Sequence, residues 1–247
     1  MITPSELMIF DMLMHDSRIG LNCSMYSMNE TQEAIELRLE MVEDQLIRRG
    51  IHETSILDAF KAIPRHIFVP QVSVMDAYTD QPLPIKAGQT ISQPYIVAQM
   101  ISYLDLRPEH RVLEIGSGSG YATAIMSKLC QRIHAIEVYQ ELIDDSHKVL
   151  TQLDLTNIDI VHQSAWEQFE ANDVYDRIIL WASPPRIPEH IFDKLGHNGI
   201  MVAPEGKTEQ YVWIYKMNNG NLSRERKDPV RFVPLVQGSV NEIDFNQ

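Results

Sequence analysis

The chain has 247 residues, of which 44% are hydrophobic, so it can bury a sizeable core without the help of disulfides or metals. Acidic residues outnumber basic ones by 34 to 21, and the net charge of −13 would repel phosphate backbones, which disfavours a nucleic-acid partner. The two cysteines form no Cys-x-x-Cys pair, and the most apolar N-terminal stretch is too short to span a bilayer. We therefore expect a cytoplasmic protein without a membrane partner or a metal.

Residues 1–30 are rich in methionine and lack a clean hydrophobic period, so we expect an N-terminal extension that is flexible or packs as a short helix. The rest, residues 31–247, is expected to form a single domain. Its first part carries Ile35, Leu39, Val42 and Leu46 at helical spacing, which predicts an amphipathic helix that ends at Gly50. A second, shorter helix is predicted at residues 56–63.

Five prolines and Gly88 lie in residues 64–94, a density that excludes long regular elements and favours an ordered loop with short strands. Together with the two helices, this loop makes residues 31–100 a helical and loop cap. From residue 101 to 247 short apolar strands alternate with helical stretches, which predicts an α/β fold with a mostly parallel sheet flanked by helices, a Rossmann-like core. The strands are predicted at residues 111–115, 133–138, 158–162, 177–181, 199–203 and 209–216, with the last of them near an antiparallel edge.

A glycine turn follows the first predicted strand of this core. Gly116, Gly118 and Gly120 follow the G-x-G-x-G spacing, whereas a dinucleotide site would place its third glycine where Tyr121 stands. Glu114 just before the turn would oppose a pyrophosphate but would suit the cationic groups of S-adenosylmethionine. Because Glu137 ends the next strand, it can accept the ribose hydroxyls of such a cofactor.

A resemblance to a known family rests on three sequence motifs. The run Gly-Gln-Thr-Ile-Ser-Gln-Pro at residues 88–94, preceded by Ala-Tyr-Thr-Asp-Gln-Pro-Leu-Pro-Ile at 77–85, looks like the signature of the protein-L-isoaspartate (D-aspartate) O-methyltransferase family. Pro-Arg at 64–65 with Phe-Val-Pro at 68–70, and Val-Arg-Phe-Val-Pro-Leu at 230–235, resemble the same family. The resemblance spans roughly residues 41–238.

The resemblance implies a class I S-adenosylmethionine-dependent methyltransferase that transfers a methyl group to the α-carboxylate of L-isoaspartyl residues in damaged proteins or peptides, a repair reaction. It implies that Ser92 is the active-site serine, which orients the carboxylate or the cofactor, and that Val233 with its neighbouring backbone binds the substrate peptide. The cofactor-binding residues it implies are Thr90, Ile91, Ser92, Glu114, Gly116, Gly118, Gly120, Glu137, Ser164 and Ala165. Without the resemblance, Ser92 would be interpreted as the N-cap of a helix that runs to about Leu104.

The chain departs from the family pattern at several places. Gln-Ser-Ala at residues 163–165 stands where the family usually has Gly-Asp-Gly, which removes the acid expected to meet the adenine amino group. His66, Lys86 and the bulky Trp181 also replace more usual residues, although Trp181 and Trp166 are best interpreted as packing residues.

These departures leave two alternatives open: a carboxyl methyltransferase with a dedicated peptide substrate, and a weakly active homologue that keeps the fold for a partner. A nicotinamide-dependent oxidoreductase is disfavoured by Tyr121 and Glu114, and nucleic-acid methylation by the net charge. The sequence does not predict an oligomeric state.

Overall fold

The computed structural model describes residues 30–169 and 173–241. The chain divides into two compact units after Thr31, and the elements below all belong to the second unit, which begins at Gln32. The methionine-rich extension predicted at residues 1–30 lies outside the described residues, apart from Glu30.

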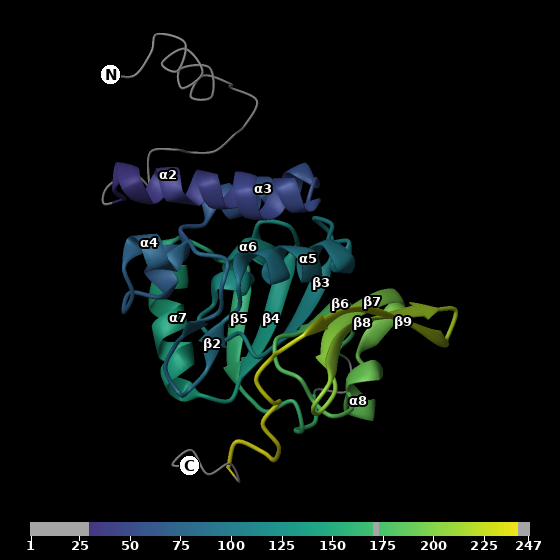
Figure 1. Cartoon of the computed structure of the whole chain (residues 1–247). Helices are drawn as coiled ribbons and strands as arrows, with labels where there is room; N and C mark the ends of the chain where they lie inside the picture. Colours follow the sequence, from purple (N-terminus) through teal and green to yellow (C-terminus); the bar gives the residue numbers. More distant parts are fainter. Residues whose placement is uncertain (1–29, 170–172, 242–247) are drawn as a thin grey trace. The chain divides into compact units, whose positions relative to one another are not determined.

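A seven-stranded sheet in the order β5-β4-β3-β6-β7-β8-β9 forms the centre of this unit (Figure 1). Neighbouring strands from β5 to β7 pair parallel, and the last two pairs are antiparallel. The prediction of a mostly parallel α/β sheet is thus confirmed. The strands are β3 (Arg111–Ile115), β4 (Arg132–Glu137), β5 (Ile158–His162), β6 (Tyr175–Leu180), β7 (Leu195–Glu205), β8 (Gln210–Asn218) and β9 (Asn221–Val230).

The edge strand β9 was not predicted. Its sequence Asn-Leu-Ser-Arg-Glu-Arg-Lys-Asp-Pro-Val is mostly exposed and has no apolar alternation, so hydrophobic periodicity could not find it. Charged residues and a proline are typical of strands at a sheet edge, because they oppose further pairing with other chains. The strand predicted at residues 209–216 therefore lies one position inside the edge.

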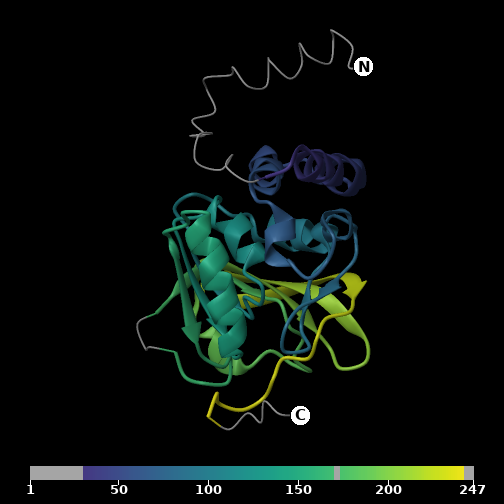
Figure 2. The same ribbon diagram turned by 90° about the vertical axis from the view of Figure 1, so that its left-hand side faces the viewer.

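Helices α5 (Pro94–Leu104) and α6 (Tyr121–Ser127) cover one face of the sheet and share a core with Val112, Ile133 and Ile179, and α3 (Thr54–Ala62) packs on these two helices. Helix α7 (Gln140–Gln152) adds Leu150 to the same core and lies alongside the strands in Figure 2. The other face is covered by the short α8 (Glu189–Phe192) together with Ala165, Phe169 and Ile187. Helices therefore flank the sheet as predicted, with the short α8 on this face.

The first predicted helix is irregular. Helix α2 (Gln32–Glu40) continues as a π-helical turn (Met41–Leu46) and a 3₁₀ turn (Ile47–Arg49), and it ends at Gly50 with φ +95°. Leu39 is 45% exposed, whereas Ala34 and Arg38 are buried. Because a π-helical turn does not keep the regular spacing of 3.6 residues, the apolar stripe assumed in the sequence is wrong at Leu39.

The proline-rich segment folds as an ordered connection, as predicted. A 3₁₀ turn (Arg65–Phe68) and the single-turn helix α4 (Val74–Ala77) precede two short strands. These strands, β1 (Leu83–Pro84) and β2 (Thr90–Ile91), pair antiparallel and form a hairpin directly before α5. The hairpin thereby places the Gly-Gln-Thr-Ile-Ser-Gln-Pro run next to the sheet.

Candidate active site

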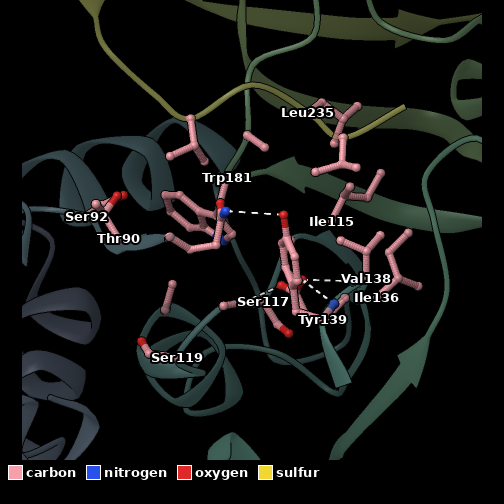
Figure 3. Close-up of a pocket in the computed structure, with 18 of the residues that line it drawn as sticks. Thr90, Ser92, Ile115, Ser117, Ser119, Ile136, Val138, Tyr139, Trp181 and Leu235 are labelled. Atoms are coloured by element: carbon pink, nitrogen blue, oxygen red, sulfur yellow. Dashed lines mark hydrogen bonds between the residues drawn. The ribbon is translucent and has the colours of Figure 1, made fainter. Parts of the chain in front are cut away.

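A pocket lies where β3 and β4 end, on the side of the sheet at which open parallel sheets bind ligands (Figure 3). Its walls come from the strand ends and glycine turn, the segment 89–92 that contains β2, the ends of β5 and β6, and the C-terminal segment 233–236. The predicted residues that line it are Thr90, Ile91, Ser92, Gly116, Gly118, Glu137, Ala165 and Val233. Glu114, Gly120 and Ser164 do not line it.

The three glycines of the turn have different surroundings. All three have positive φ angles, which glycine adopts without strain. A Cβ atom at Gly116 would meet no atom within 4 Å, so the turn leaves open space toward the pocket there. A Cβ atom at Gly120 would lie 2.9 Å from the Cβ of Ser146 on α7. Gly120 therefore serves the packing of the turn against α7, while Gly116 and Gly118 face the pocket.

Glu137 connects the glycine turn to the end of β4. Its Oε1 accepts hydrogen bonds from the amides of Val138 at 2.8 Å and Tyr139 at 3.1 Å, and its Oε2 accepts one from Gly118 at 2.9 Å. Burial raises the pKa of Glu137, and these three amide donors oppose that rise. Because a carboxylate offers about four acceptor positions, one position on Oε2 remains for a ligand hydroxyl.

Glu114 lies beneath the pocket. Its side chain is fully buried, and its Oε1 accepts a hydrogen bond of 2.8 Å from the indole nitrogen of Trp181, a residue that does line the pocket. Burial, with the nearby charge of Glu137, raises the pKa of Glu114 to about 7, although the Thr123 side chain and the indole donor oppose this. Glu114 was expected to contact a cationic group of the cofactor directly. In the structure its carboxyl group contacts Trp181 instead.

The segment after β5 presents Gln163 and Ala165 to the pocket, and Ser164 points away from it. Ser164 is fully buried, its amide donates to Glu167 at 2.8 Å, and its hydroxyl accepts from the amide of Trp166 at 3.2 Å. Both groups of Ser164 are therefore used within the turn. Gln163 is the polar side chain of this segment that can meet a ligand.

Ser92 does not cap α5, because the N-cap position belongs to Gln93, whose side chain makes no capping bond. Asp80 fixes this end of the helix instead: its carboxylate accepts from the Tyr95 amide at 3.2 Å and pairs with Arg49. Ser92 is half-buried and borders the pocket, with its hydroxyl unused by the helix. The capping interpretation of Ser92 is therefore wrong.

The wall formed by Val233 is held by backbone hydrogen bonds to the segment after β6. Ser183 donates its amide to the Val233 carbonyl at 2.8 Å, and its own carbonyl accepts from Leu235 at 3.0 Å. Further along, the indole nitrogen of Trp166 donates to the Val236 carbonyl at 2.8 Å. Trp166 is thus a packing residue that anchors this wall, whereas Trp181 both packs and lines the pocket.

Sequence reasoning missed Tyr139 and its contact with Gln89. The Gln89 side chain donates to the Tyr139 hydroxyl at 3.4 Å, which joins the hairpin to the end of β4 across the pocket (Figure 3). Lys86 at the hairpin tip also forms an ion pair of 2.5 Å with Asp145 on α7. The position of Tyr139 two residues after Glu137 was the signal that could have found it.

Two negative findings apply to residues 30–169 and 173–241. No group of three or more His, Cys, Asp or Glu side chains there can hold a metal ion. None of the helices in these ranges has the length and apolar character needed to cross a membrane.

Residues 38–240 match the family described as protein-L-isoaspartate(D-aspartate) O-methyltransferase. A protein-L-isoaspartate O-methyltransferase of Pectobacterium atrosepticum is 40% identical over 206 residues, which are 83% of this chain and 99% of the relative. One of Vibrio cholerae is 41% identical over 195 residues, 79% of this chain and 94% of the relative.

Solved structures give the same result. A putative enzyme of this name from Plasmodium falciparum, in complex with S-adenosyl-L-homocysteine, aligns with a TM-score of 0.71 and 25% identity over 81% of this chain and 99% of its own. A second structure titled protein-L-isoaspartate O-methyltransferase, 23% identical, aligns with a TM-score of 0.73 over 83% of this chain and 66% of its own, and shows the shared fold. The chain belongs to the protein-L-isoaspartate(D-aspartate) O-methyltransferase family.

Proposed function

We propose that this chain transfers a methyl group from S-adenosylmethionine to the α-carboxylate of L-isoaspartyl residues in damaged proteins and peptides. The observation that carries the proposal is the pocket at the ends of β3 and β4, which Thr90 and Ser92 of the Gly-Gln-Thr-Ile-Ser-Gln-Pro run border. Membership of the family and the names of its bacterial members support the assignment of the substrate.

The residues present fit S-adenosylmethionine. Open space at Gly116 lets backbone approach the amino-acid part, and the remaining acceptor position on Glu137 suits the ribose hydroxyls. Gln163 replaces the usual acid near the adenine, and the backbone of Ala165 borders the same region. When bound, this cofactor supplies a methyl group attached to a positively charged sulfur. Transfer of the methyl group leaves a neutral thioether, which is an excellent leaving group.

The chain's residues act by positioning rather than by covalent chemistry. The substrate's carboxylate oxygen forms a bond to the methyl carbon while the methyl–sulfur bond breaks and its electron pair returns to sulfur. No proton leaves, so no general base is needed. Ser92 donates its hydroxyl to the carboxylate and orients it, and Thr90 and Ile91 help to keep water from the reacting atoms.

The partners of the chain are, in this proposal, isoaspartyl-containing proteins, with Val233 and its neighbouring backbone as part of the peptide wall. A main-chain wall suits a repair enzyme, because it tolerates varied side chains. A cytoplasmic location is also proposed, because Cys130 is a free cysteine and not part of a disulfide. The division into a cap of residues 31–100 and a core of residues 101–247 likewise remains a proposal.

The test is transfer of labelled methyl groups to two peptides that differ only in an isoaspartyl or an aspartyl linkage. We expect labelling of the isoaspartyl peptide alone, and a fall in kcat of about tenfold in Ser92→Ala with cofactor affinity unchanged. Ser223→Ala, at an exposed position of β9 that lines neither the pocket nor the segment around Ser92, is the matched control. Cofactor binding without labelling of either peptide would instead favour an enzyme with a dedicated peptide substrate, and absence of both would favour a non-catalytic homologue.

A further inference from the structure

A second, open groove meets the cofactor pocket at Thr90 and Ser92, which line both cavities. The other residues of this groove come from the hairpin, the start of α5 and the end of β9: Pro82, Gln93, Ile96, Pro229, Val230, Arg231 and Phe232. Since the methyl acceptor has to reach the cofactor past Ser92, the groove is the approach of the acceptor peptide. This step rests on the proposed function.

Within the described residues, Arg231 is the one charged side chain that lines the groove. It is exposed, and it forms no hydrogen bond or ion pair there, in contrast to the nearby acids. Asp80 is paired with Arg49, and Asp228 accepts from the Tyr103 hydroxyl at 3.1 Å. The groove therefore presents an unpaired cation on a chain whose net charge is −13.

The backbone that carries Arg231 is fixed from both sides. Val230 pairs with Gln210 at the end of β9, and the Gln210 side chain accepts from the Phe232 amide at 2.6 Å and donates to the Phe232 carbonyl at 3.2 Å. Arg231 thus extends from an ordered backbone position in the groove that Ser92 also lines, where its guanidinium can bind a carboxylate of the acceptor peptide.

We propose that Arg231 is a specificity-determining residue, which makes the protein select isoaspartyl sites flanked by an aspartate or glutamate side chain. Arg231 does not bind the carboxylate that accepts the methyl group, because a guanidinium bound to that carboxylate would reduce the nucleophilicity of its oxygen. The pairing fits the substrate class chemically: deamidated and isomerised segments of acidic proteins would be repelled by the chain as a whole and attracted at this one place.

The test uses isoaspartyl peptides in which a single flanking residue is glutamate, glutamine or lysine, placed in turn on each side of the damaged site. Binding is measured by fluorescence anisotropy in the presence of S-adenosyl-L-homocysteine, and methyl transfer is measured in parallel. The proteins are the wild type, Arg231→Gln, Arg231→Lys and Arg226→Gln, the last an arginine on β9 that lies over the Tyr211 ring and outside the groove.

At one or more positions we expect the wild type to bind the glutamate peptide about three- to fivefold more tightly than its glutamine twin, as for an exposed charge pair. Arg231→Gln should lose this preference, and Arg231→Lys should keep part of it. The control Arg226→Gln should keep the whole preference and the wild-type kcat. An equal affinity for all peptides, or a preference that survives in Arg231→Gln, would overturn the proposal. Binding with the predicted preference but without methyl transfer would refute the proposed reaction and leave the role of Arg231 standing.

Discussion

The neighbouring strands β3 and β4 each carry a buried carboxyl group near their ends, and the structure gives the two groups different surroundings. Glu137 borders the pocket and accepts three backbone amides, whereas Glu114 is enclosed and accepts the indole of Trp181. Glu137 keeps an acceptor position for a ligand, while burial raises the pKa of Glu114 to about 7. Two acids at the ends of neighbouring strands can thus have different roles: one is available to bind a ligand, and the other supports the pocket wall.

The largest expected effect is on cofactor affinity, which should depend on Glu137 far more than on Glu114. Glu137→Ala should weaken the binding of S-adenosylmethionine about a hundredfold, because both the ribose acceptor and the anchor of Gly118 are lost. Isothermal titration calorimetry measures this, with Glu141→Ala on the exposed face of α7 as the control. An equally large loss in a folded Glu114→Ala protein would break the comparison.

The next effect concerns stability and pH. The pKa of Glu114 is higher in the folded protein than in the unfolded chain. Its contribution to the free energy of unfolding is therefore fully present below about pH 4.5 and is lost as pH rises toward about 7. Glu114→Gln should remove this loss, on the order of 2 kcal/mol in the free energy of unfolding. Urea unfolding from pH 5 to 8 tests the sign: a wild type and variant that change in parallel would contradict it.

Trp181→Phe tests the surroundings of Glu114 by removing the indole donor of its hydrogen bond. Loss of the indole hydrogen bond removes a group that favours the charged form of Glu114, so the pKa of Glu114 should rise further. At pH 8 the variant should lose about 1 to 2 kcal/mol of stability, and less at pH 5, where the carboxyl group is neutral. Trp166→Phe, which removes a donor to a backbone carbonyl, should show no such pH dependence.

The smallest effect is expected at Tyr139, beside Glu137. Tyr139→Phe removes one hydrogen bond of 3.4 Å to Gln89, which is long and partly exposed. Cofactor affinity should change less than about twofold. A tenfold loss in equilibrium binding would show that the contact across the pocket, and not Glu137 alone, holds the cofactor at this strand end.

The sequence predicted the elements that repeat a simple period. The parallel strands and the glycine turn were found because buried strands give continuous apolar runs and glycines mark the turn. Edge strand β9 was missed because charges and Pro229 hide its pairing, and Leu39 was placed on the wrong face because a π-helical turn shifts the helix. Both errors come from tertiary context that a local pattern does not contain.

For the site, sequence motifs named most of the pocket wall, but they could not assign side-chain direction. The positions of Glu114, Gly120 and Ser164 in their motifs were found, yet packing against Trp181, α7 and the turn of Glu167 turns them from the pocket. Tyr139 and the groove residue Arg231 gain their meaning from segments far apart in the chain. Such contacts follow from the topology of the sheet rather than from spacing.

The most direct test of the central claim follows the fate of a single isoaspartyl peptide during incubation with the protein and S-adenosylmethionine. Methylation of its α-carboxylate should give a base-labile ester that cyclises to a succinimide, whose hydrolysis returns part of the peptide as the normal aspartyl form. Chromatography with mass spectrometry over repeated cycles should therefore show loss of the isoaspartyl peptide and growth of the aspartyl peptide. An isoaspartyl peptide that remains unchanged while the cofactor is bound would contradict the account.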